Sequence, residues 1–306
     1  MKKSSIRDIA LIMGDVIHNR KVLNPRLTGG LCNKLYCLMS ACEIAQKKNY
    51  KVLEPQFGWK SKMNFSEIYD IDYFNLTMKE LTGVENIMIS SRQEVSEKDI
   101  IQRSISLWDY SQKNIRRLRE NNIIYQDSMM VYLMKSLKLK KQYQDIVFEN
   151  LSNFLAVQIR IESDWVTYSN KVEVSQNETL LIDLDKLIEM VIEFNSPNKI
   201  FFTTGENHQY IKDRLSEKGI ESSFFYDPSL EYEINAAINF EILSHSKKFI
   251  GLSRSTFSNL ITLKRQLLLN KNENYIYNYG EKIHMRSDYG LYPSAFESIN
   301  KNPSLK

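Results

Sequence analysis

The sequence is short of the residues that mark several special classes of protein. Of its 306 residues, 10 are glycine, 6 are proline and 3 are cysteine. So little glycine and proline excludes collagen-like and broadly disordered chains. The cysteines are odd in number and lie five residues apart, at Cys32, Cys37 and Cys42, which matches neither a disulfide framework nor a metal site. No apolar run approaches the roughly 20 residues that span a bilayer. We therefore expect a protein of a reducing compartment, the cytoplasm, without a transmembrane segment.

Charge of either sign is nearly balanced. Lysine and arginine total 41 against 37 aspartates and glutamates, which leaves a net charge of +4. This excess is too small for a dedicated nucleic-acid binder, so we expect no nucleic-acid partner. It is compatible with one local basic pocket for an anion. Hydrophobic residues make up 42% of the chain, which is enough for a sizeable core, and the length favours two domains.

Predicted strands alternate with predicted helices along most of the chain. The first half has strands at 22–27 and 50–53, a helix at 33–47, and charged segments at 112–120 and 134–144 that we interpret as surface helices. The second half is more regular, with strands predicted at 154–161, 199–203, 222–226 and 248–252 and helices at 181–194, 207–218, 234–244 and 255–269. This alternation is typical of an α/β protein whose parallel sheets are covered by helices. We divide the chain into domains 1–145 and 146–306, with the change between 135 and 149, and expect a ligand cleft at the carboxyl ends of the strands.

The first segment that could carry chemistry is residues 27–35, where a strand leads through Gly29 and Gly30 into a helix. Two glycines allow a sharp turn and a close approach of the backbone to a ligand, and a helix N-terminus favours negative charge. We expect the amide of Asn33, in the first helical turn, to face the cleft. A plain strand–helix turn with Asn33 as a cap is an open alternative. The spacing is not GxGxxG and gives little support to a nicotinamide cofactor.

The second segment is residues 154–165, an apolar strand that runs into Arg160, Glu162, Asp164 and Trp165. An arginine at the carboxyl end of a strand can grip a phosphate through two parallel hydrogen bonds. The alternative is an Arg160–Glu162 pair on an exposed edge, which would contribute little to stability.

The third segment is residues 249–259, where an apolar strand ends at Gly251 and hydroxyl residues lead into a helix. Ser255 and Thr256 offer a side-chain cap together with free backbone N–H groups, a combination that binds anions. The same residues could serve as a simple N-cap, and the pattern alone does not separate the two.

Together, and in this order, the three segments resemble the fucosyltransferase superfamily, most closely the protein O-fucosyltransferase type. Residues 29–34 are similar to the family's Gly-Arg/Gly-Leu/Phe-x-Asn-Gln loop, residues 157–165 to its His-x-Arg-x-x-x-Asp-Trp segment and residues 249–258 to its Phe-Ile-Gly…Ser-Ser-Phe-Thr segment. The similarity extends over residues 27–72, 153–165 and the C-terminal third as far as 265, with a weaker motif at 64–70. It implies a GT-B arrangement, two Rossmann-like domains facing a central cleft, and an inverting transfer of fucose from GDP-fucose.

The resemblance also implies roles for single residues. Arg160 would bind the β-phosphate and take up the charge that develops as GDP leaves, while Asn33 faces the sugar and the acceptor. Glu162 and Asp164 are candidates for the general base. The other donor-binding positions are Gly29, Gly30, Asp164, Trp165, Ser255, Thr256 and Phe257. The donor is a substrate, the acceptor is a hydroxyl of a glycan or glycoprotein, and no cofactor is implied.

The same resemblance implies that no metal is required, because fixed cations would neutralise the diphosphate. Two Asp-x-Asp triplets, at 70–72 and 183–185, match a pattern with which some glycosyltransferases hold a divalent metal. Such triplets are common by chance, and the second lies at a predicted helix start, where acidic residues favour the helix dipole.

Three positions depart from the family pattern. Gln158 replaces the family's histidine, Gly30 stands where several relatives carry arginine, and Lys34 replaces glutamine. Two other functions therefore stay open: a GT-B glycosyltransferase that uses a different nucleotide sugar in polysaccharide synthesis, and a sugar- or nucleotide-binding module without catalysis.

Overall fold

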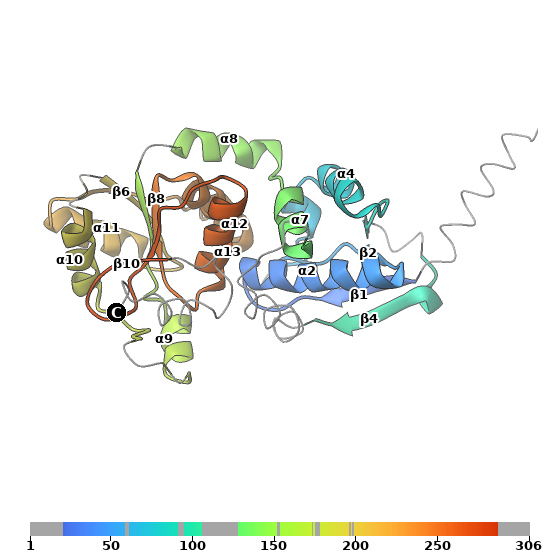
Figure 1. The fold of residues 1–306 in the computed structure, drawn as a ribbon, viewed down its shortest axis with the longest axis horizontal. Helices are drawn as coiled ribbons and strands as arrows, with labels where there is room; N and C mark the ends of the chain where they lie inside the picture. The colour runs from blue at the N-terminus through green and yellow to red at the C-terminus, as the bar shows by residue number, and fades with distance from the viewer. Residues whose placement is uncertain are drawn as a thin grey trace, which may run out of the picture. The chain divides into compact units, whose positions relative to one another are not determined.

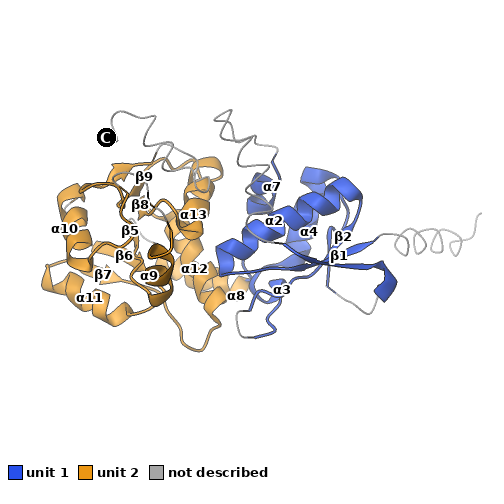
Figure 2. Ribbon diagram, turned by 90° about the horizontal axis from the view of Figure 1, so that it is seen from below, with its two compact units in different colours: residues 1–116, 125–140 blue, residues 117–124, 141–306 orange. Residues whose placement is uncertain are grey.

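The computed structural model describes residues 21–58, 61–90, 95–105, 128–151, 154–172, 174, 178–195, 197 and 199–286. These residues form two compact units, one that ends at Lys140 and one that starts at Lys141 (Figure 2). None of the described helices combines the length and the apolar character needed to cross a membrane.

Unit 1 is built on a sheet of parallel strands in the order β3-β2-β1-β4. The strands are β1 (Val22–Arg26), β2 (Lys51–Leu53), β3 (Met88–Ile89) and β4 (Ile100–Ser104). The helices of this unit are α2 (Leu31–Lys48), α3 (Phe65–Ile68), α4 (Ile71–Thr82) and α7 (Met129–Ser136), with a 3₁₀ turn at Glu97–Asp99. Helix α7 packs against α2 and α4 (Figure 1).

Helix α2 is buried around most of its circumference. Leu35, Leu38, Met39 and Cys42 recur at steps of three and four residues and are fully buried, so the helix is held mainly by packing. It ends at Asn49, whose left-handed backbone closes the last turn.

Unit 2 is built on a larger sheet in the order β10-β9-β8-β5-β6-β7. All neighbouring strands are parallel except β10, which pairs antiparallel with β9. The strands are β5 (Leu155–Gln158), β6 (Lys199–Thr203), β7 (Glu221–Ser223), β8 (Lys248–Gly251), β9 (Asn274–Ile276) and β10 (His284–Met285). The five parallel strands follow the Rossmann order, in which the third, second, first, fourth and fifth strands lie side by side.

Helices cover both faces of this sheet. They are α8 (Lys141–Asn150), α9 (Ser163–Ser169), α10 (Leu184–Asn195), α11 (His208–Glu217), α12 (Tyr232–His245) and α13 (Thr256–Leu267). In Figure 1, α10 and α11 lie on one side of the sheet and α12 and α13 on the other. All four residues of β5 are buried, as expected for a central strand with helices on both faces.

A buried arginine joins the end of α12 to α13 and β9. Arg265 is fully buried, and its guanidinium donates to the backbone carbonyls of Ser244, Ser246 and Lys247 and to Asn274 Oδ1. Because these acceptors satisfy its donors, Arg265 has a structural role.

The alternation predicted for the second half is confirmed, with differences at the ends of elements. The strand predicted at 154–161 is shorter in the structure, where β5 ends at Gln158; Ile159 still donates its N–H to the carbonyl of Thr203 in β6. The single surface helix predicted at 134–144 is wrong, since α7 and α8 flank an extended link at 137–140. The helix predicted at 112–120 lies outside the described residues.

Candidate functional site

The second and third sequence segments meet at the switch point of the unit 2 sheet. β5 and β8 are hydrogen-bonded neighbours, but the chain leaves β5 toward β6 on one side and β8 toward β9 on the other. In an open α/β sheet the loops at such a point diverge and leave a crevice at the carboxyl ends of the strands, where ligands bind. The residues placed there are those that follow Gln158 and Gly251.

A buried hydrogen bond fixes these two loops to each other. The hydroxyl of Ser258, in the first turn of α13, donates to Gln158 Oε1 and accepts from the N–H of Leu252 at 3.1 Å. A Cβ on Gly251 would lie 2.2 Å from this hydroxyl oxygen, so only glycine fits beside it. Gln158, which replaces the family's histidine, is therefore a buried link between β5 and α13.

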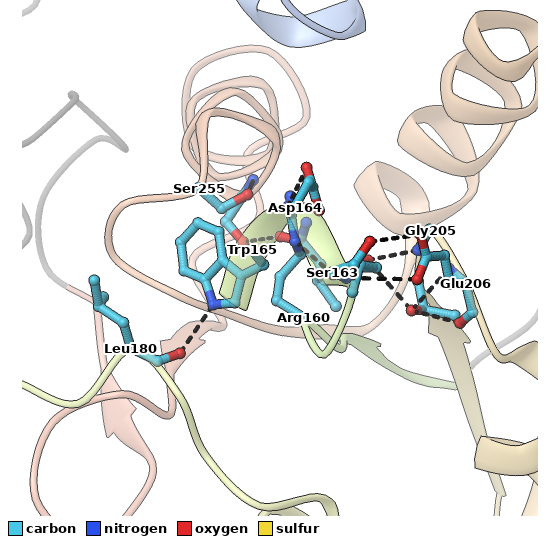
Figure 3. Close-up of polar contacts among 12 residues, drawn as sticks. Arg160, Ser163, Asp164, Trp165, Leu180, Gly205, Glu206 and Ser255 are labelled. Carbon is cyan, nitrogen blue, oxygen red and sulfur yellow. Dashed lines mark hydrogen bonds and ion pairs between the residues drawn. The ribbon is translucent and has the colours of Figure 1, made fainter. Parts of the chain in front are cut away.

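Arg160 follows β5 at this switch point. Its Nε lies 2.8 Å from Glu162 Oε2, and its Nη2 lies 3.3 Å from both carboxylate oxygens of Asp164 (Figure 3). Its guanidinium carbon is 4.7 Å from the centre of the Trp165 ring, within cation–π range. The Arg160 side chain is 19% exposed, so it is held but still reachable.

Glu162 is a buried carboxylate that lies between two strand ends. Its Oε1 accepts from the N–H of Gly205 at 2.5 Å and from the hydroxyl of Thr204 at 3.3 Å, and both of these residues follow β6, the neighbour of β5. Its Oε2 lies 2.8 Å from Arg160 Nε as an ion pair, but this contact is not aligned as a hydrogen bond, and Oε2 has no hydrogen-bond partner among the described residues. The carboxylate thus places its negative charge beside the guanidinium.

Asp164 differs from Glu162 in its exposure. Its side chain is 78% exposed, and its contacts to Arg160 are long. An exposed ion pair of this kind contributes little to stability, so Asp164 is free to move or to exchange its partner.

Trp165 lies against the guanidinium of Arg160. It is buried, donates its indole N–H to the carbonyl of Leu180 at 2.9 Å and stacks on Tyr168 with ring centres 5.2 Å apart. Figure 3 shows Trp165 directed toward Leu180 with Arg160 beside it. In this arrangement its contact is with the guanidinium, whereas the resemblance implies contact with the donor.

The N-terminus of α13 is the second half of the crevice. Ser255 is its N-cap and accepts from the N–H of Ser258 at 3.4 Å. Thr256 and Phe257 are half-buried and begin the helix, and the first N–H groups of a helix have no acceptor within it. Phe257 also packs edge-on against Phe240 of α12, 5.8 Å between ring centres.

Sequence reasoning missed three contributors to this site. Thr204 and Gly205 follow β6, and Tyr277 follows β9 with its N–H donated to the carbonyl of Gly251. Burial raises the pKa of Tyr277, and its phenol also senses the charges of Glu162 and Arg160. A signal was present for the first two, since polar residues come directly after the predicted strand 199–203; Tyr277 follows a strand that was not predicted.

The first sequence segment lies in unit 1. Gly30 is the N-cap of α2, and Gly29 has a φ of 81°, a left-handed conformation that favours glycine. A Cβ on Gly29 would lie 2.5 Å from Asn33 Nδ2, so the asparagine side chain packs against the glycine. Asn33 makes no cap bond, and its buried Oδ1 has no hydrogen-bond partner among the described residues. The N-cap is therefore Gly30 and not Asn33, and Asn33 retains an acceptor.

Lys34 has a local partner. Its side chain is buried, and Nζ donates to the carbonyl of Phe57 at 2.5 Å. This contact ties α2 to the chain after β2.

The two Asp-x-Asp triplets occupy helix starts. Asp70 caps α4 by accepting from the N–H of Tyr73 at 3.0 Å, and Asp183 accepts from the N–H of Asp185 at 2.9 Å. Asp185 in turn pairs with Arg214. Within the described part of the chain, no three histidine, cysteine or carboxylate side chains gather as a metal site would require.

The comparisons place this architecture among known structures. No protein-family model matches the sequence, and no curated protein matches it. The crystal structure of POFUT1 in complex with GDP is similar with a TM-score of 0.56 at 12% identity, covering 84% of this chain and 97% of that chain. NodZ alpha-1,6-fucosyltransferase soaked with GDP-fucose gives a TM-score of 0.52 at 14% identity, covering 87% and 99%. NodZ from Bradyrhizobium gives 0.51 at 14%, covering 87% and 98%.

The likeness at these identities shows the fold. The α/β fold of the fucosyltransferase-like GT-B type, with a Rossmann-like sheet in each unit, is confirmed.

Proposed function

We propose that this protein is a glycosyltransferase that transfers fucose from GDP-fucose to a hydroxyl group of a glycan or protein. The observation that carries the proposal is that Arg160 and the capped N-terminus of α13 follow the adjacent strands β5 and β8 at the switch point of unit 2. Two similar structures, POFUT1 in complex with GDP-fucose and NodZ soaked with GDP-fucose, bear the proposed donor on the same fold.

Arg160 is suited to a phosphate group that leaves with negative charge. Its bond to buried Glu162 fixes the orientation of the guanidinium, whereas its bonds to exposed Asp164 are long and easily replaced. A β-phosphate could take the place of Asp164 and accept hydrogen bonds from the guanidinium. Preorganised donors of this kind typically contribute on the order of 10²–10³ in rate each.

The N-terminus of α13 would bind the same diphosphate. Free N–H groups of Ser255, Thr256 and Phe257 and the positive end of the helix dipole both favour an anion. Because a guanidinium and a helix N-terminus together compensate the diphosphate, we propose a reaction that needs no metal. EDTA should then leave transfer intact, and a loss restored by Mg²⁺ or Mn²⁺ would contradict this part of the proposal.

The acceptor hydroxyl must lose a proton during an inverting displacement. Glu162 is buried beside Arg160 whereas Asp164 is largely exposed, so we assign Glu162 to positioning Arg160 and propose Asp164 as the base. Asn33, with a buried acceptor oxygen lacking a partner, is proposed to bind a hydroxyl of the sugar or acceptor, beside the backbone of Gly29 and Gly30.

Thermal shift with GDP, UDP, CDP and GMP, followed by donor hydrolysis and transfer assays, tests the proposal. We expect GDP to stabilise the protein most and GDP-fucose to be hydrolysed slowly without an acceptor. Preference for UDP would favour a different nucleotide sugar, and nucleotide binding without hydrolysis or transfer would favour a binding module. A glycan array would then identify the acceptor.

A further inference from the structure

A buried carboxylate outside the proposed machinery holds the loop between β8 and α13. Glu178 has a side chain with no exposed surface. Its Oε1 accepts from the hydroxyl of Ser253 at 2.8 Å and from Arg254 Nε at 2.9 Å, and its Oε2 accepts from Arg254 Nη2 at 2.7 Å. Ser253 and Arg254 are the two residues directly before Ser255, the N-cap of α13.

A second side chain locks the same loop. Asn278 Oδ1 accepts from the N–H of Ser253 at 2.9 Å, and Asn278 Nδ2 donates to the Ser253 hydroxyl at 2.8 Å. The carbonyl of Asn278 accepts from the N–H of Thr179, and Glu178 and Tyr279 form an isolated β-bridge. The segment that starts at Glu178 is thereby fixed against both the loop and the chain after β9.

The same short segment also contacts Trp165, the residue that lies against Arg160. Two residues after Glu178, the carbonyl of Leu180 accepts the indole N–H of Trp165, whose ring lies against the Arg160 guanidinium. Residues 178–180 therefore touch the support of the arginine at one end and the loop before the helix N-terminus at the other.

We propose that Glu178 is a positioning residue that sets the spacing between the Arg160 guanidinium and the N-terminus of α13. This inference rests on the proposed function, because it assigns Glu178 to the binding of the diphosphate. Glu178 acts through Ser253 and Arg254 and makes no contact with substrate. A buried carboxylate with three charge-assisted or hydroxyl donors is costly to bury without them, so the loop has one strongly preferred arrangement.

Charge and geometry predict opposite effects for Glu178→Gln. Removing a negative charge near the site would by itself strengthen binding of an anion. Loss of the bidentate bond to Arg254 would instead loosen the loop and weaken binding of the anion. If Glu178 positions the loop, we expect GDP affinity to fall by about tenfold or more, with a smaller effect on GMP, which lacks the β-phosphate.

The experiment measures the dissociation constants of GDP and GMP by calorimetry for the wild type, Glu178→Gln, Arg254→Lys and Ser253→Ala. The dissociation constant of GMP divided by that of GDP should fall toward 1 in all three variants. Glu241→Gln is the matched control, because Glu241 pairs with Lys264 at 2.6 Å in a part-buried bond at the other end of α13. It should lower the melting temperature and leave the ratio unchanged.

Each outcome decides one of the two proposals. A wild type that does not bind GDP contradicts the proposed function itself. A wild type that binds GDP, together with variants whose ratio is unchanged or whose GDP affinity rises, overturns the role of Glu178. If Glu178→Gln does not fold, the ratio in Arg254→Lys and Ser253→Ala decides in the same way.

Discussion

The hydroxyl of Ser258 donates to Gln158 Oε1, so the first turn of α13 is bonded directly to the end of the central strand β5. The hydroxyl oxygen of Ser258 also accepts a hydrogen bond from the N–H of Leu252. One side chain thus fixes both loops of the switch point, and the position of the helix N-terminus depends on it.

Ser258→Ala should destabilise unit 2 and weaken nucleotide binding. It leaves Gln158 Oε1 and the Leu252 N–H buried without a partner, at a cost of about 1–3 kcal/mol. Urea denaturation measures this change in the free energy of unfolding. Ser244→Ala is the control, because Ser244 is equally buried but donates only to the carbonyl of Phe240 within its own helix. Equal effects of the two substitutions would contradict the linking role of Ser258.

The N-caps of α13 and α7 give a matched pair of variants. Ser255 and Ser128 each accept from a backbone N–H three residues on, at 3.4 Å. Each serine-to-alanine change should cost about 1 kcal/mol of stability. We expect only Ser255→Ala to weaken GDP binding as measured by calorimetry. A comparable loss of GDP affinity in Ser128→Ala would show that the effect is one of general stability.

Alanine substitutions at two glycines of unit 1 distinguish the cost of backbone strain from the cost of steric crowding. Gly29 and Gly83 both have positive φ, 81° and 73°, but a Cβ would meet Asn33 only at Gly29. Gly83→Ala should cost about 1–2 kcal/mol from its left-handed backbone alone. Gly29→Ala should cost about 1–3 kcal/mol more because of overpacking. Chemical denaturation that ranks the two variants in the reverse order would contradict the packing of Asn33 on Gly29.

His208 should make stability depend on pH. Burial lowers its pKa, and this effect exceeds the opposing ones of a hydrogen bond to the Thr204 backbone and of the Glu162 charge. In the unfolded chain the pKa of histidine is about 6.5. At a pH between the folded-state pKa and this value, His208 is therefore protonated more in the unfolded chain than in the folded protein. Stability should fall as pH drops below about 6.5 and level off below the folded-state pKa.

His208→Phe provides the comparison for that pH dependence. The ring of His208 stacks on Tyr226 at 4.6 Å, which phenylalanine can preserve without titrating. The melting temperature of the variant minus that of the wild type should increase as the pH is lowered from 8 to 5. A difference that stays constant over this range would show that His208 does not resist protonation.

The alternation of strands and helices in unit 2 could be predicted from the sequence, because the apolar residues of strands and of helices follow different patterns along the chain. The strand 199–203 was predicted with its observed ends, and α12 and α13 within two residues. The strands β3, β4, β9 and β10 escaped prediction, although β2 and β7, which are no longer than β9, were predicted. The helix predicted across 134–144 failed because the prediction rested on charged residues, and the lysines continue through the extended link that separates α7 from α8.

The site shows a similar division. The grouping of Arg160 with Ser255 followed from a resemblance in motifs and their order, and their meeting follows from the Rossmann strand order. The environment of each side chain did not follow. Nothing in the spacing of residues indicated that Glu162 accepts from the N–H of Gly205 or that Trp165 donates to the carbonyl of Leu180. These contacts join residues 43 and 15 positions apart, so they exist only after folding.

Calorimetric titration of GDP into the wild type and Arg160→Ala tests the central claim most directly. The account predicts that the variant keeps its circular dichroism spectrum and loses about 10- to 100-fold in GDP affinity, while the wild type binds. An Arg160→Ala protein that is folded and binds GDP as tightly as the wild type would contradict the claim that this guanidinium grips the diphosphate.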